Sequence, residues 1–136
     1  MTVRYLSAGL ALMGAGAILV SAGPALAQAA PAGDAEAGAD LYSTECRGCH
    51  SVSIAPTHRG LINRPAASVA AFTGYSDALK AKGAAGLVWT ETNISTFITG
   101  PQNLVPGTLM TKIIADPQQR ADIIAYIATL PPPRQQ

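Results

Sequence analysis

Charged residues are scarce in this chain and neither sign is in clear excess. They make up 12% of the 136 residues, as nine Lys and Arg against eight Asp and Glu. Domains that bind nucleic acids present a marked basic excess. The composition therefore argues against a nucleic-acid partner.

Cysteine is almost absent as well, since the chain contains only Cys46 and Cys49. A disulfide between them would close a very short loop and stabilise the fold little. Both lie in the stretch "TECRGCHS", with His50 directly after the second cysteine. These three neighbours point to a chemistry that uses all of them.

The first 27 residues contain a single charge, Arg4, followed by an uncharged run to Ala27. A basic start, an apolar middle and a small-residue end (residues 25–27, Ala-Leu-Ala) follow the order of a secretory signal. We predict cleavage before Gln28 and export to the periplasm. An uncharged span of about 20 residues would also suffice for an uncleaved membrane anchor, which Pro24 and the many Ala and Gly disfavour.

Residues 28–136 then form one domain of 109 residues, with its core expected over 33–130. Removing Arg4 leaves eight basic and eight acidic residues, so this part has no net charge. A domain of this size has a modest hydrophobic core. A bound group that fills part of the interior would therefore add to the stability of such a domain.

Capping and stop signals predict short helices separated by long loops. The expected helices cover 35–46 after a cap at Asp34, 76–82 with a stop at Gly83, and 91–99 after a cap at Thr90. Asp116, with Pro117 at the first helical position, opens a last helix that runs to about residue 130. Residues 51–73 are rich in turn formers and show no sustained alternation, and 102–110 are expected to be an extended loop. The predicted fold class is all-α.

Four chemistries compete for the cysteine pair and His50. A thioredoxin-like redox pair requires a βαβ context, for which strands are missing. Zinc would need four ligands, and Cys46, Cys49, His50 and His58 can be counted, although structural sites usually space their second pair further away. A disulfide is the third. The fourth is covalent haem, in which each thiol bonds to a vinyl group and the adjacent histidine ligates iron.

At this point the sequence resembles the class I cytochromes c over nearly all of residues 33–130. The likeness lies in five blocks in the family's order: "GDAEAGADLYSTECRGCH", "GYSDALKAKG", Trp89, "VPGTLM" and "RADIIAYIATL". The resemblance implies a single domain of about four to five helices around one haem c, attached at Cys46 and Cys49.

The resemblance also implies the two axial ligands of the iron. His50 is the proximal ligand, and the carbonyl of Pro56 takes its other ring N–H. Met110 is the sixth ligand, in the family's order Pro-Gly-Thr-x-Met, and it is the only methionine after residue 27. His/Met ligation raises the reduction potential, which suits an electron carrier.

Further residues fall at family positions around the haem. Four are expected to donate hydrogen bonds to the propionates: Arg64, Tyr75, Trp89 and Thr108. Phe97 stands where many relatives carry a tyrosine beside the methionine sulfur. The departures from the family pattern are Ala55 and Asn63 in place of glycines, His58 in place of a leucine against the haem, and Leu109 in place of a frequent lysine.

The predicted function is a periplasmic electron carrier that is not an enzyme and that meets redox proteins as donor and acceptor. These partners are expected in a respiratory or dehydrogenase complex, and the chain meets a membrane only through a partner or an uncleaved signal. A dedicated haem c subunit of a periplasmic dehydrogenase or oxidase is the alternative. A haem sensor or gas-binding protein is a remote third, disfavoured because Met110 would fill the sixth position.

Overall fold

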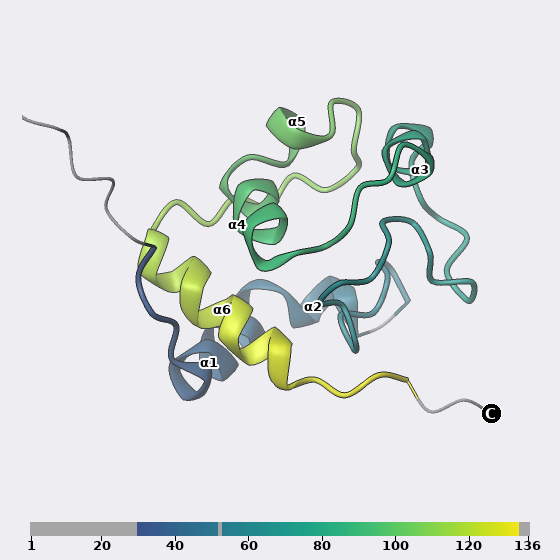
Figure 1. Ribbon diagram of the computed structural model, residues 1–136. Coiled ribbons are helices and arrows are strands. Elements are labelled where there is room, and N and C mark those ends of the chain that lie inside the picture. Colours follow the sequence, from purple (N-terminus) through teal and green to yellow (C-terminus); the bar gives the residue numbers. More distant parts are fainter. Residues whose placement is uncertain (1–29, 52, 134–136) are drawn as a thin grey trace, which may run out of the picture.

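Helices joined by long loops make up the described part of the chain. The computed structural model describes residues 30–51 and 53–133, so the predicted signal sequence and its predicted cleavage point lie outside the described residues. The helical segments are α1 (Ala35–Glu45), α2 (Arg47–His50), α3 (Asp77–Ala84), α4 (Glu91–Thr99), α5 (Pro101–Leu104) and α6 (Pro117–Thr129) (Figure 1). Extended pairing among these residues is limited to one isolated bridge, Pro65 with Val88. The predicted all-α class is confirmed.

Three predicted helix caps are present. Asp34, Thr90 and Asp116 each accept a hydrogen bond from a backbone N–H in the first turn of α1, α4 and α6, at 2.8, 3.1 and 2.7 Å. Such a cap satisfies a backbone donor that has no partner within the helix. None of the described helices is both long and apolar enough to cross a membrane.

The prediction that Gly83 stops the third helix is wrong. Helix α3 continues through Gly83 to Ala84, and Gly86 follows with a φ of +91°. A Cβ on Gly83 would lie 2.3 Å from the carbonyl oxygen of Ala66. Gly83 therefore permits a close approach of the 66–67 loop, while Gly86 takes the left-handed conformation that ends the helix.

Two short helical turns were not predicted. The first helix ends at Glu45 rather than at Cys46, and α2 starts anew after Cys46, whose φ is −121°. Residues 102–104, expected to belong to an extended loop, instead lie in α5, which has Pro101 at its first position. A single turn has no periodicity from which it can be recognised, and proline at N1 suits a helix start.

Helices α1 and α6 cross in close contact (Figure 1). A Cβ on Gly38 would lie 1.9 Å from the carbonyl oxygen of Asp122, so this crossing requires glycine at residue 38. The buried carboxylate of Asp122 accepts hydrogen bonds of 2.8 Å from the backbone N–H of Asp34 and from Gln118. The start of α1 is thereby tied to α6.

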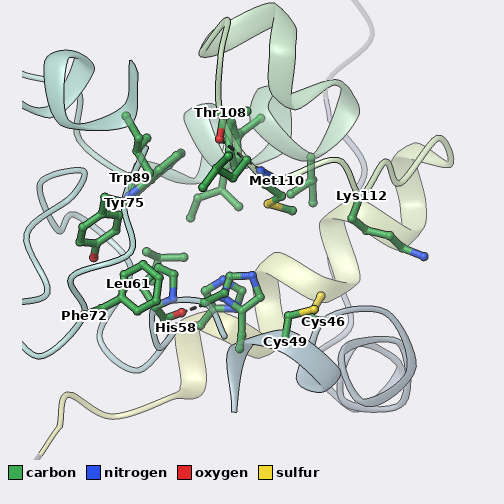
Figure 2. Close-up of a pocket in the computed structure, with 18 of the residues that line it drawn as sticks. Cys46, Cys49, His58, Leu61, Phe72, Tyr75, Trp89, Thr108, Met110 and Lys112 are labelled. Atoms are coloured by element: carbon green, nitrogen blue, oxygen red, sulfur yellow. Dashed lines mark hydrogen bonds between the residues drawn. The ribbon is translucent and has the colours of Figure 1, made fainter. Parts of the chain in front are cut away.

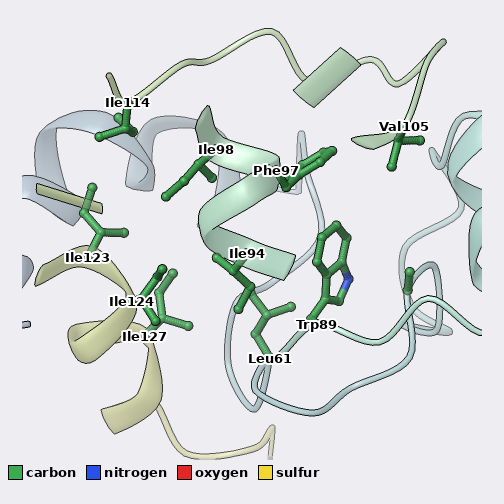
Figure 3. Packing of buried hydrophobic residues seen from close by; sticks show 11 residues of the cluster. Leu61, Trp89, Ile94, Phe97, Ile98, Val105, Ile114, Ile123, Ile124 and Ile127 are labelled. Atoms are coloured by element: carbon green, nitrogen blue, oxygen red, sulfur yellow. The ribbon is translucent and has the colours of Figure 1, made fainter. Parts of the chain in front are cut away.

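Apolar side chains of α4 and α6 form the centre of the core. Val105 and Ile123 are the most deeply buried, at 0% and 1% exposure. The cluster is completed by Leu61, Ala66, Trp89, Ile94, Phe97, Ile98, Ile114, Ile124 and Ile127 (Figure 3). Several of these residues also face a cavity, so the core forms one side of the candidate site.

Candidate functional site

A single cavity of about 460 Å³ brings together every residue that the sequence singled out for the site. Its lining includes Cys46, Cys49, His50, Pro56, Arg64, Tyr75, Trp89, Phe97, Thr108 and Met110. This volume is typical of pockets for organic ligands and far exceeds what a lone metal ion needs. Within the described residues, no three His, Cys, Asp or Glu side chains are grouped to hold a metal, so the geometry disfavours the zinc alternative.

One wall of the cavity is the turn that carries the cysteine pair. Cys46 caps α2, and the backbone N–H groups of Cys49 and His50 both donate to its carbonyl, at 3.3 and 3.1 Å. Cys46 is partly buried and Cys49 is exposed, and both thiols are free. Burial, followed by the charge of Glu45, raises the pKa of Cys46 to about 11. Cys46 and Cys49 both line the cavity and are joined by the single turn of α2, so one helical turn presents both sulfurs to it.

One hydrogen bond fixes the tautomer of His50. Its Nδ1 lies 2.7 Å from the carbonyl oxygen of Pro56. Burial lowers the pKa of His50, an effect that the Pro56 hydrogen bond opposes. The neutral ring then donates from Nδ1 to Pro56, which leaves the lone pair on Nε2 for a metal ion.

Met110 lies across the cavity from Cys49 and His58 (Figure 2). Its loop is held by Gln102, whose side-chain amide donates to the carbonyl of Thr108 at 2.8 Å and accepts from the N–H of Gly107 at 2.9 Å. Gly107 has a φ of +89°, which favours glycine. No motif in the sequence marks Gln102 as a brace of this loop, since its partners are recognisable only once α5 is folded.

Polar side chains gather at the end of the cavity where Tyr75 and Trp89 lie (Figure 2). Arg64 donates to the carbonyls of Thr57 and Arg59 at 2.7 and 2.8 Å, and burial lowers its pKa. The backbone around the Pro65–Val88 bridge sets Trp89 beside this arginine, since the N–H of Trp89 donates to the carbonyl of Arg64 at 2.9 Å. A half-buried cation at this end favours an anionic group on the ligand.

Lys112 lies at the opposite end of the cavity and forms an ion pair with Glu45 (Figure 2). The pair connects the loop after Met110 with the end of α1. Ile54 and Leu109 also line the cavity and are 68% and 76% exposed, so they mark its opening. No motif in the sequence signals this pairing, because residues 45 and 112 are far apart along the chain.

These features together fit haem c: thiols and a free imidazole nitrogen on one wall, a thioether on the other, an apolar interior and donors at one end. His58, which stands where the resemblance to the family predicted a leucine, also lines the cavity. Burial, then the charges of His50 and Arg64, lower the pKa of His58 to about 3, so its ring is neutral.

Comparison with known proteins gives the same family at the level of sequence and structure. The family described as "Cytochrome c" matches residues 35–131. A cytochrome c2 of Rhodomicrobium vannielii is 35% identical over 105 residues, which cover 72% of this chain and 80% of the relative. A cytochrome c of Guizotia abyssinica is 35% identical over 103 residues, covering 71% and 89%.

Solved structures agree with these relatives. The ferricytochrome c2 of Rhodopseudomonas palustris superposes with a TM-score of 0.65 at 34% identity, covering 71% of this chain and 98% of that one. Cytochrome cH of Methylobacterium extorquens gives 0.64 at 36% identity, covering 71% and 99%. This chain belongs to the cytochrome c family, whose members are electron-transfer proteins with one covalently attached haem c.

Proposed function

We propose that this chain is an exported electron carrier of the periplasm, with haem attached to Cys46 and Cys49 and iron held between His50 and Met110. The supporting observation is that the thiols and the imidazole lie on one wall of a ligand-sized cavity and the thioether lies on the other. The family match, over residues 35–131, spans this chain from the start of α1 to just beyond the end of α6.

The bound haem supplies a one-electron couple. The chain supplies two ligands that need not move when the charge on the site changes. Pro56 holds His50 by its ring N–H, and Gln102 holds the loop of Met110. Because both ligands are held by short-range contacts, little reorganisation accompanies electron transfer.

The polar end of the cavity is proposed to receive the propionates, from donors on Arg64, Tyr75, Trp89 and Thr108. Thr108 is buried at 7% exposure, and its Oγ1 lies 3.5 Å from the N–H of Met110. Phe97 lines the same cavity and packs against Trp89, with ring centroids 5.0 Å apart. Phenylalanine has no hydroxyl to donate to the methionine sulfur, so that ligand is held in an apolar setting.

Purification of the native protein tests export and the free-carrier function together. We expect an intact mass that corresponds to residues 28–136 plus one haem, from a protein that elutes without a partner. A mass that includes residues 1–27 in the membrane fraction would instead indicate an anchored carrier. Stoichiometric co-elution with a dehydrogenase or oxidase would favour the dedicated-subunit alternative.

The partner is proposed to be a redox protein with an uncharged, apolar contact face. The chain has only three lysines, and two of them are paired internally: Lys80 with Asp77 at 3.1 Å and Lys112 with Glu45. The opening of the cavity instead exposes Ile54 and Leu109. Contact between apolar faces stabilises a complex through burial rather than through charge.

Electron transfer to the natural partner is therefore expected to depend only weakly on ionic strength. Electrostatic steering changes association rates by about 10- to 1,000-fold. For this protein we expect the rate of electron transfer to change by less than about twofold as salt is added. Stopped-flow kinetics measure this. Leu109→Ser should weaken binding about tenfold through lost apolar burial, and the charge-paired Lys80→Ser is the matched control. A steep fall in rate with added salt would contradict the apolar contact face.

A further inference from the structure

His58 places a second imidazole directly against the proposed iron ligand. The rings of His58 and His50 are stacked, with centroids 3.8 Å apart and planes inclined by 27°. Tyr42 forms a T-shaped pair with His58, with ring centroids 5.6 Å apart and planes inclined by 67°, and it packs on Tyr126 of α6 with centroids 5.1 Å apart. His58 is therefore held between the helix crossing and His50.

The location of His58 rules out a role as the sixth ligand in this fold. Axial ligands lie on opposite faces of the macrocycle, so the haem has to fit between them. Two rings stacked at 3.8 Å are already in van der Waals contact and leave no space between them. Met110, by contrast, lies across the cavity from His58 (Figure 2).

His58 also carries a polar atom without a protein partner. Its Nδ1 is buried, and no hydrogen bond is formed to it by the described residues. Leaving a buried polar atom unpaired costs free energy, so packing alone would favour an apolar side chain here. A leucine would fill the same wall without that cost, which indicates that the imidazole has another role.

We infer that His58 is a positioning residue for the proximal ligand: its ring face fixes the rotation of His50 and lowers the reduction potential of the bound iron. This inference rests on the proposed ligation of iron by His50. Oxidised iron withdraws more electron density from its ligand than reduced iron does. The electron-rich face of a neutral aromatic ring stabilises adjacent positive charge, so stacking favours the oxidised state.

The test compares two substitutions in the haem-loaded protein. His58→Leu removes the ring face, and His58→Phe keeps a ring face without the nitrogens. A contact of about 0.5–1 kcal/mol corresponds to a two- to fivefold shift in the equilibrium between the oxidised and reduced states. We expect His58→Leu to shift this equilibrium toward the reduced state by that factor, and His58→Phe to stay close to the unsubstituted protein in redox titrations.

A second readout reports the ring orientation. The pattern of paramagnetic shifts in the NMR spectrum of the oxidised protein depends on the plane of the axial imidazole, and it should change in His58→Leu and persist in His58→Phe. If His58→Leu fails to load haem, His58→Gln removes the ring and should produce the same shift toward the reduced state.

Two results would overturn the inference. An unchanged potential in the variant without a ring would show that His58 only fills space. Equal shifts of the reduction potential in His58→Leu and in His58→Phe would show that the ring face does not lower the potential. If the unsubstituted protein itself fails to retain haem or to ligate it through His50, the proposed function fails, and this outcome is recognised before any variant is compared.

Discussion

Replacing Met110 with alanine is expected to open the haem iron to carbon monoxide and to lower the reduction potential. Met110 is the only methionine after residue 27, and it lies across the cavity from the cysteine wall. Removing the thioether takes away the ligand that raises the potential in His/Met-ligated haem. The decrease should be a substantial part of the roughly 0.8 V range over which axial ligands set potentials.

Carbon monoxide titration of the reduced protein and a redox titration measure the two effects. Leu109→Ala is the matched control, because Leu109 is the neighbouring residue and is 76% exposed. This control should bind no carbon monoxide, as expected for the unsubstituted protein, whereas Met110→Ala should bind one equivalent. Equal behaviour of the protein with and without Met110 would show that a different residue fills the sixth position, and stacking on His50 places His58 on the wrong side to be that residue.

Removing both cysteines is expected to abolish covalent haem attachment completely. Each thiol would add across one vinyl C=C bond of the haem, with its sulfur bonding one carbon and its proton going to the other. The resulting thioethers survive denaturation, whereas the bond from His50 to iron depends on the fold. On a denaturing gel the unsubstituted protein should therefore retain its haem, and the variant with both Cys46→Ala and Cys49→Ala should release all of it.

The single cysteine variants and a neighbouring substitution complete this experiment. Cys46→Ala and Cys49→Ala should each keep haem through one thioether, because both sulfurs reach the cavity from the same turn. Ser51→Ala is the control, since Ser51 is exposed and its hydroxyl donates back to the carbonyl of Arg47 at 2.6 Å. Release of haem from the unsubstituted protein on the gel would disprove covalent attachment. Zinc in place of iron on elemental analysis would support the alternative that the cysteines bind zinc.

Several features of the site were predictable because their chemistry is encoded by neighbouring residues. The Cys-x-x-Cys-His spacing places two thiols and an imidazole on one turn in any helical context. Caps at Asp34 and Thr90 depend on the same few residues that they stabilise. The all-α class was predictable for the same reason, since helix signals are local and a sustained period-2 alternation was missing.

Contacts that depend on how the loops and helices fold against each other were decided only by the tertiary structure. The sequence could mark His58 as a departure from the family, yet only the folded chain shows that it stacks on His50, on the wall of the cavity opposite Met110. The same holds for the brace by Gln102 and for the ion pair of Glu45 with Lys112. Local spacing determines which groups are available to bind haem. Which of these groups face each other depends on how α1, α4 and α6 pack together around the cavity, and no short stretch of sequence encodes that packing.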